Sequence, residues 1–286
     1  MVAEANLEEL VEKSVFILRE TAAQYRKPAV LWSTGKDSTT TLNLIREAFF
    51  GAVPWPVIHI DTGYKFPQIY RFRDRVAKEW NLNLVVARNE EYFGKISPSK
   101  ATKFECCTNL KTEALKQLIR REGFDSIVVS IRRDEHGIRG KERYMSPRDK
   151  DFRWNIYRVQ ETATGDSGIE ALQDTELSGW SLFSSDFGPD CDHVRVHPIL
   201  HWTEADVWRY VKNRKLPVNP LYFAKNGRRY RSLGCQTCTQ PIASNAQTID
   251  QIVEEIERSP RDERAGRAQD KEEAYMMQKL RALGYM

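Results

Sequence analysis

The sequence predicts an α/β protein with a parallel sheet, a long insertion and a helical C-terminal tail. Short apolar runs alternate with longer segments in which apolar residues recur every three or four positions, the patterns of buried strands and amphipathic helices. This alternation predicts right-handed crossovers and a ligand site at the carboxyl ends of the strands. The chain has 286 residues, 41% of them hydrophobic, which is enough for one large core with an appendage.

The first half of the chain carries the clearest alternation. Apolar spacing predicts an opening helix over Leu7–Tyr25, which Pro28 ends. Further helices are expected from the loop at Ser33 to Phe49, between the second and third strands up to Trp80, and over Cys107–Arg121. The expected strands are Ala29–Trp32, Val57–Ile60, Leu82–Ala87 and Ser126–Ser130. Each strand–helix pair therefore reads as one unit of a parallel sheet.

The second half is less regular. Residues 132–193 have no clear periodicity, and loops of this length are usually functional or mobile. A strand is expected over Val194–Leu200, then a helix capped by Thr203, and a short helix after Thr248. We expect one main domain over residues 1–235, including the insertion, and a helical tail over residues 236–286.

Charge and hydropathy exclude some classes of protein. The chain has 44 Lys and Arg against 40 Asp and Glu, and a net charge of +4 does not by itself imply nucleic acid. No apolar run approaches the roughly 20 residues of a membrane span. We therefore expect a cytoplasmic protein without a membrane partner.

The loop at Ser33–Ser38 is the most informative motif. A strand that delivers small residues and a Lys to a helix N-terminus builds an anion site from backbone N–H groups and the helix dipole. A Walker A loop is excluded, because Val30 and Asp37 stand where that motif needs a Gly and a Ser or Thr. The loop should bind phosphate in a different way.

The motif Ser-x-Gly-Lys-Asp-Ser resembles the PP-loop of the N-type ATP pyrophosphatases. The resemblance extends over His59–Gly63, Ile131–Glu135, Lys141–Arg143 and Ser244–Thr248, and together these segments look most like the small, ATP-binding subunit of sulfate adenylyltransferase. It implies an adenine-nucleotide alpha hydrolase-like fold, which is Rossmann-like and of HUP type. The chain departs from many PP-loops at Thr34, where they have Gly.

The resemblance also implies the site residues and an enzyme that cleaves ATP between the α and β phosphates. Catalytic roles fall to Lys36, Arg132 and Arg133. ATP and Mg²⁺ would contact Ser33, Thr34, Gly35, Lys36, Asp37, Ser38, Asp61, Thr62 and Gly63. Asp61 is equally compatible with Mg²⁺, with ribose and with a helix cap. Replacing Lys36 with Ala is expected to abolish pyrophosphate release and leave the fold intact.

Five cysteines bring a second signal. Four form an adjacent pair and a Cys-x-x-Cys, namely Cys106, Cys107, Cys235 and Cys238. This spacing resembles the cluster-bearing sulfonucleotide reductases and the ATP pyrophosphatases of DNA phosphorothioation, the Dnd and Ssp types, and it implies one [4Fe-4S] cluster. The competing interpretation is four buried thiols that pack like small apolar side chains. Cys191 has no partner in this scheme.

These signals leave two enzymatic functions and one non-enzymatic function. The cysteines favour activation of a DNA backbone phosphate for sulfur insertion, in a multi-protein complex with DNA and a cysteine desulfurase. The alternative is the small subunit of sulfate adenylyltransferase, which would act on sulfate with a GTPase partner. The basic stretch Arg139–Arg158 matches both. Reduction of a sulfonucleotide is not expected, because the tail has no cysteine. A nucleotide-sensing module without turnover is the third possibility.

Overall fold

The computed structural model of the chain describes residues 2–96, 100–135, 139, 142–153, 187, 190–258 and 263. Its centre is a six-stranded sheet in the order β3-β2-β1-β4-β6-β5. The strands are β1 (Pro28–Leu31), β2 (Val57–Ile60), β3 (Leu84–Ala87), β4 (Ser126–Val128), β5 (Met145–Arg148) and β6 (His193–Val196). Neighbouring strands are parallel, except that β5 pairs antiparallel with β6 at the edge. The predicted α/β fold is confirmed.

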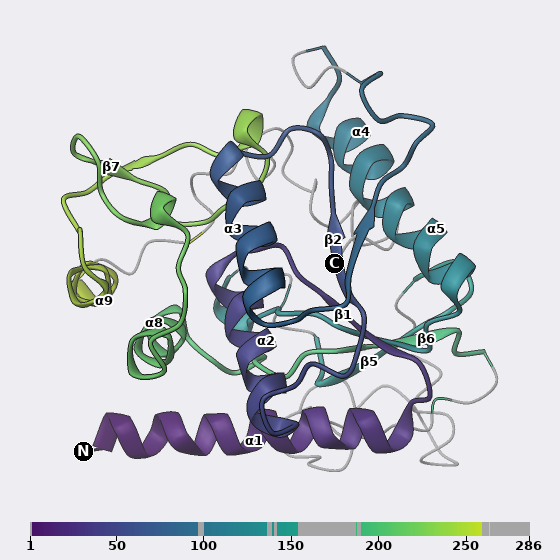
Figure 1. Ribbon diagram of the computed structural model, residues 1–286, viewed down its shortest axis with the longest axis horizontal. Coiled ribbons are helices and arrows are strands. Elements are labelled where there is room, and N and C mark those ends of the chain that lie inside the picture. Colours follow the sequence, from purple (N-terminus) through teal and green to yellow (C-terminus); the bar gives the residue numbers. More distant parts are fainter. Residues whose placement is uncertain are drawn as a thin grey trace, which may run out of the picture.

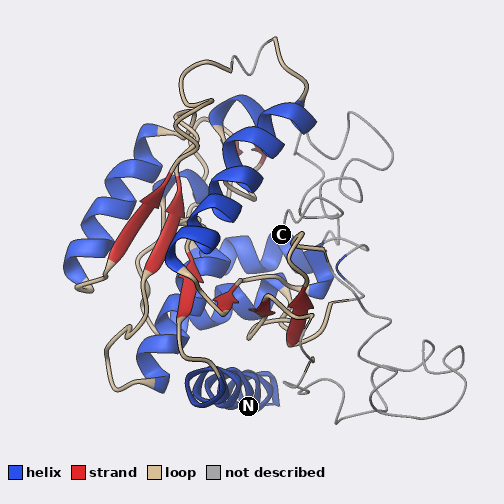
Figure 2. Ribbon diagram, turned by 90° about the vertical axis from the view of Figure 1, so that its right-hand side faces the viewer, coloured by secondary structure: helices blue, strands red, loops and turns tan. Residues whose placement is uncertain are grey.

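Helices cover both faces of this sheet, and two more belong to a smaller layer beside it. In chain order, the helices are α1 (Val2–Gln24), α2 (Lys36–Ala48), α3 (Pro67–Glu79), α4 (Lys103–Cys107), α5 (Glu113–Glu122) and, in the smaller layer, α8 (Glu204–Asn213) and α9 (Ile249–Arg258). Helices α2 and α3 lie on one side of β2, α4 and α5 lie on the other, and α1 runs across one end (Figure 1). Figure 2 shows the strands between these helical layers. The strand order arises because the chain moves outward from β1 to β3 and then crosses back to place β4 on the other side of β1.

The strand order reverses at β1. This strand pairs with β2 on one side and with β4 on the other, so the loops that follow β1 and β4 leave the same edge of the sheet next to each other. In open parallel sheets, ligands bind at such a switch point. The loop at Ser33 follows β1, and the segment at Arg132 follows β4. The topology therefore brings two of the predicted motifs together.

The chain after β6 adds a smaller layer, which contains α8, α9 and a two-stranded sheet of β7 (Arg228–Arg229) and β8 (Ile242–Ala243). Helix α9 lies against α8 through the exposed ion pairs Arg209–Glu257 and Lys212–Asp250. Strand β7 pairs with β8 across residue 235, where the sequence places a domain boundary. That boundary stays a prediction.

Three local features differ from the expectation. Strand β5 falls in the segment expected to be irregular, and its Pro147 is tolerated because an edge strand leaves one row of backbone groups unpaired. The strand expected to reach Leu200 ends at Val196. Helix α4 already begins at Lys103, and a π-helical turn joins it to α5. Residues 154–186 of the expected insertion and residues 264–286 of the expected tail lie outside the described residues.

The apolar core lies between the sheet and these helices and includes the buried indoles of Trp32, Trp202 and Trp208. In the described part of the chain, no helix combines the length and the apolar character that a membrane crossing needs.

Candidate active site

The loop between β1 and α2 is tied to itself and to a distant tyrosine. The hydroxyls of Ser33 and Ser38 share a hydrogen bond of 3.1 Å, and the Ser38 hydroxyl also donates to the Gly35 carbonyl at 3.2 Å. The backbone N–H of Lys36 donates to the hydroxyl of Tyr222, 2.9 Å away. A Cβ atom at Gly35 would lie 3.3 Å from both the Ser33 and the Tyr222 hydroxyl oxygens, which leaves little room for a larger residue. The loop is therefore held in one shape.

Thr34 occupies the position where many PP-loops have glycine. Its φ is 66°, in the left-handed region, where a β-branched residue is strained and glycine is not. Its hydroxyl donates to the Ser33 carbonyl at 2.5 Å, a local bond that glycine cannot make. The loop thus keeps the backbone shape that favours glycine at this position.

Two buried cations stand behind the loop. The ammonium of Lys36 contacts Asp37 at 3.0 Å and the carboxylate of Glu263. The guanidinium of Arg132 contacts Asp134 at 2.9 Å, and it also pairs with Asp37 and Glu263. The Lys36 side chain is 1% exposed and that of Arg132 is 0% exposed. Two of the predicted phosphate-binding residues therefore share the carboxylates of Asp37 and Glu263.

The electrostatics follow from this pairing. Burial alone would lower the pKa of Arg132, but the neighbouring carboxylates, Glu263 first, raise it above its ordinary value. Burial alone would raise the pKa of Glu263, but Lys36 and Arg132 hold it well below its ordinary range. Glu204 lies 3.9 Å from Lys36, and its pKa is raised by burial and then by Glu263. The carboxylates of Asp37, Glu204 and Glu263 thus compete for the ammonium of Lys36.

Arg133 takes a different direction from Arg132. It lies in the short 3-10 helix Arg133–Glu135, and its guanidinium donates to the Glu142 carbonyl at 3.1 Å. Neither Arg132 nor Arg133 is among the described residues that line the main pocket. Arg132 nevertheless contacts Asp37 and Glu263, which do line it, whereas Arg133 donates to the Glu142 carbonyl. Its predicted catalytic role stays a prediction.

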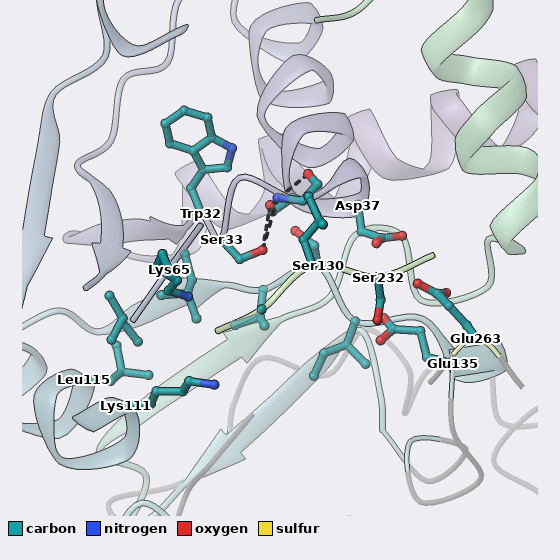
Figure 3. A pocket seen from close by; sticks show the side chains of 18 of the residues that line it. Trp32, Ser33, Asp37, Lys65, Lys111, Leu115, Ser130, Glu135, Ser232 and Glu263 are labelled. Atoms are coloured by element: carbon teal, nitrogen blue, oxygen red, sulfur yellow. Dashed lines mark hydrogen bonds between the residues drawn. The ribbon is translucent and has the colours of Figure 1, made fainter. Parts of the chain in front are cut away.

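The pocket opens where the loops after β1 and β4 meet. Its empty volume, including the part open to solvent, is about 1160 Å³. Trp32, Leu115 and Ile131 belong to its apolar wall, a surface suited to a flat base. Figure 3 shows Lys65 and Lys111 at one end and Glu263 at the other, with Ser33 and Ser130 between them. The pocket therefore has a basic end and an acidic end.

The segment after β2 is fixed by its own side chains. Burial would raise the pKa of Asp61, but hydrogen bonds from the Gly63 N–H, the Tyr70 hydroxyl and the Arg88 guanidinium keep it below its ordinary value. Gly63 has a φ of 77°, and a Cβ atom there would lie 3.2 Å from the Phe93 ring. The carboxylate of Asp61 is thus held within the turn after β2 and does not cap α3, whose N-cap residue is Phe66, while its predicted contacts with Mg²⁺ or ribose stay predictions.

The four predicted cysteines gather near the basic end of the pocket. All four are buried. Burial, followed by the charges of Cys107 and Cys235, raises the pKa of Cys106 to about 12, and Cys238 adds to this shift. The hydroxyl of Thr62 lies 3.2 Å from the Cys235 sulfur. The fold thus brings the pair on α4 close to the Cys-x-x-Cys, as the cluster hypothesis requires.

No group of three or more His, Cys, Asp or Glu side chains within the described ranges has the arrangement of a site for a single metal ion. The predicted cluster site therefore stays a prediction. Cys191 lies apart from the quartet, before β6, and its sulfur donates to the His193 carbonyl at 3.5 Å. The expectation that Cys191 has no part in a cluster stays a prediction.

Several site residues escaped the sequence analysis. Tyr222 follows Pro217 and Pro220, which indicate a turn in the sequence but do not indicate a contact with the loop at Ser33. Glu204 reads only as part of the first turn of a helix. Glu263 lies in a charged segment that reads as a solvated face. Lys65 and Lys111 belong to none of the motifs described above, although Lys111 follows the cysteine pair on the same helical stretch.

Comparisons with known proteins agree with this architecture. The profile of the phosphoadenosine phosphosulfate reductase domain matches residues 27–241. The sulfate adenylyltransferase subunit 2 of Zymomonas mobilis is 35% identical over 98% of this chain and 97% of its own length. The protein of the same name from Pseudoalteromonas translucida is 34% identical over 99% of this chain and 100% of its own length.

Solved structures with low identity share the fold. Phosphoadenylyl-sulfate reductase from Candida auris has a TM-score of 0.52 at 15% identity, covering 80% of this chain and 94% of that one. Yeast FAD synthetase has a TM-score of 0.55 at 16% identity, covering 93% of this chain and 92% of that one.

Proposed function

This chain belongs to the phosphoadenosine phosphosulfate reductase domain family, and we propose that it is an ATP-dependent adenylyltransferase whose acceptor is sulfate. An acceptor oxygen attacks the α-phosphorus of ATP, the bond to the β-phosphate oxygen breaks, and pyrophosphate leaves with the electron pair. The observation that carries the proposal is similarity along the whole chain to proteins named sulfate adenylyltransferase subunit 2. The phosphorothioation function expected from the cysteines therefore takes second place.

The described residues supply what this reaction needs. The loop hydroxyls of Ser33 and Ser38 and the N-terminus of α2 bind phosphate oxygens. Lys36 and Arg132 neutralise the charge that develops on the leaving pyrophosphate. The apolar wall around Trp32 accepts the adenine. The basic end at Lys65 and Lys111 suits the acceptor anion, because two cationic side chains lie there and the acidic end is on the other side of the loop at Ser33.

Mg²⁺ fits this site as a partner of the nucleotide. Asp37 lines the pocket in the first turn of α2, and Mg²⁺ is usually held by one or two carboxylates together with substrate phosphates. A bound Mg²⁺ would offset the negative charge of the phosphates. Phosphate oxygens of ATP and water molecules would supply the remaining ligands.

The relatives are named subunit 2 of sulfate adenylyltransferase, and this name supports a complex with another subunit rather than an isolated enzyme. We expect a GTPase subunit as the partner for the sulfate reaction. A DNA substrate and a cysteine desulfurase belong to the second candidate function only.

The direct test is product identity. Purified protein, incubated with ATP and Mg²⁺ and with or without sulfate and a partner subunit, should form adenylyl sulfate and pyrophosphate in equal amounts. The products are separated by anion-exchange chromatography. ADP and inorganic phosphate as the only products would refute adenylyl transfer. Sulfate-independent AMP formation that rises with duplex DNA, desulfurase and cysteine would move the acceptor from sulfate to DNA.

The second candidate, activation of a DNA phosphate for sulfur insertion, is kept because of one observation. Cys106, Cys107, Cys235 and Cys238 are close enough for the other three to raise the pKa of Cys106. A four-iron cluster takes one thiolate on each iron, so its ligands surround a larger volume than the ligands of one ion. Sulfate adenylylation has no step that would use such a cluster.

Iron analysis tests this candidate. Anaerobically purified and reconstituted protein should be brown with about four irons per chain. Replacing Cys106 with Ser should reduce the iron content, whereas Cys191→Ser, the matched control outside the quartet, should not. Colourless protein without iron after reconstitution would remove the cluster and leave sulfate adenylylation alone.

A further inference from the structure

The acidic end of the pocket stands in front of the two buried cations. The pocket is lined there by the carboxylates of Asp37, Glu135 and Glu263, of which Glu135 is paired with Arg139, another lining residue. Lys36 and Arg132 are almost completely buried and do not belong to the described lining of the main pocket. A phosphate group that enters the pocket therefore meets carboxylates before it reaches the ammonium and the guanidinium.

Asp37 and Glu263 each contact both cations, and of these two carboxylates only Glu263 comes from outside the loop. One oxygen of Glu263 accepts a hydrogen bond from Lys36 and the other accepts one from Arg132. Its side chain is 5% exposed, and the two cations keep its pKa well below the ordinary value, so it is charged at neutral pH. A carboxylate that bridges two cations with two oxygens makes the same contacts as two oxygens of a phosphate.

The local charge also opposes a polyanion. The contact network contains three cations, Lys36, Arg132 and Arg231, against the four carboxylates of Asp37, Asp134, Glu204 and Glu263. Its sum is −1, and it becomes zero when Glu263 leaves. The pKa of Glu204 is already raised in part by Glu263, which shows the repulsion inside the network.

We propose that the carboxylate of Glu263 is an internal competitor for the anion subsite of Lys36 and Arg132, and that a polyphosphate group binds both cations only when Glu263 has withdrawn. The inference rests on the proposed function, because that function assigns these cations to the leaving pyrophosphate. Phosphate binding is then coupled to the position of residue 263. This coupling weakens the affinity for pyrophosphate and helps the product to leave.

Pyrophosphate alone, without divalent cations, is the suitable probe. Its dissociation constant is measured by isothermal titration calorimetry in EDTA for the wild type, Glu263→Gln and the control Glu257→Gln. Glu257 forms an exposed ion pair with Arg209 on α9, away from the pocket. We expect Glu263→Gln to bind pyrophosphate at least about tenfold more tightly, as when one competing charge-assisted contact is lost. Glu257→Gln should bind like the wild type.

Each possible result of the pyrophosphate titration either supports or refutes the proposal. Unchanged or weaker binding by folded Glu263→Gln would overturn the proposal and leave the proposed function standing. If neither protein binds pyrophosphate, the assignment of Lys36 and Arg132 to phosphate fails as well. Should Glu263→Gln not fold, Glu263→Asp keeps the charge but has a shorter reach, so it should also bind more tightly. The same titration is repeated with Mg²⁺ in place of EDTA. If Glu263→Gln binds pyrophosphate more weakly than the wild type only when Mg²⁺ is present, Glu263 is a metal ligand and competition is refuted.

Discussion

Removing the charge of Lys36 should cost stability as well as activity. Its ammonium contacts Asp37 and Glu263 and lies 3.9 Å from Glu204, and its side chain is 1% exposed. Lys36→Ala therefore leaves buried carboxylates with less compensation. Breaking a buried ion pair from one side typically costs about 3 to 5 kcal/mol. The expectation from the sequence, an inactive variant with an intact fold, stays a prediction, to which the structure adds this loss of unfolding free energy.

The assay is urea unfolding followed by circular dichroism, together with pyrophosphate release. Lys36→Ala should lose pyrophosphate release and about 3 to 5 kcal/mol of unfolding free energy. Adding Glu263→Gln should restore about 1 to 3 kcal/mol, because the second change removes the orphaned charge. If Lys36→Ala unfolds within about 1 kcal/mol of the wild type, or if the two changes add without coupling, the described ion network is refuted.

Three further predictions concern the same fold. Burial lowers the pKa of His197 to about 4, so the histidine's contribution to stability is present above its unfolded pKa near 6.5 and is lost as the pH falls toward 4. Between pH 6.5 and pH 5, the loss of unfolding free energy should be about 2 kcal/mol smaller for His197→Asn than for the wild type, measured by urea unfolding at both pH values. Gly63→Ala should cost more than Gly94→Ala, because both have a positive φ but only Gly63 has a ring within 4 Å; equal losses would contradict the steric argument. Asp134→Ala should lower stability by about 1 to 3 kcal/mol in urea unfolding, since it removes an acceptor of the buried Arg132 guanidinium and of the Glu204 backbone N–H, and an unchanged unfolding free energy would contradict the importance of these contacts.

The sheet and the phosphate loop could be predicted from the sequence because both depend on local pattern. Short apolar runs that alternate with amphipathic segments specify parallel strands and crossover helices. A polar loop between the first strand and α2 then falls at the switch point. Strand β5 could not be found this way, because Met145–Arg148 contains a proline and is a strand only through pairing with β6. Pairing partners distant in sequence leave no local signal.

The charged part of the site was predicted incompletely for a related reason. Lys36 and Arg132 belong to motifs, but the carboxylates that bind them come from three separate segments. Glu263 is separated from Lys36 by 227 positions. In a charged segment, a single glutamate cannot be distinguished by sequence from its solvated neighbours. Only the fold shows that one of them is buried against two cations.

The motif after β4 joins the two halves of the site. Asp134 accepts from Arg132 with one carboxylate oxygen and from the backbone N–H of Glu204, 2.8 Å away, with the other. Glu204 opens α8 and pairs with Arg231 at 2.7 Å. A displacement of Arg132 would therefore reach the start of α8 through Asp134. Because the same guanidinium also binds Glu263, the occupant of the anion subsite is linked to the packing of α8 against α2.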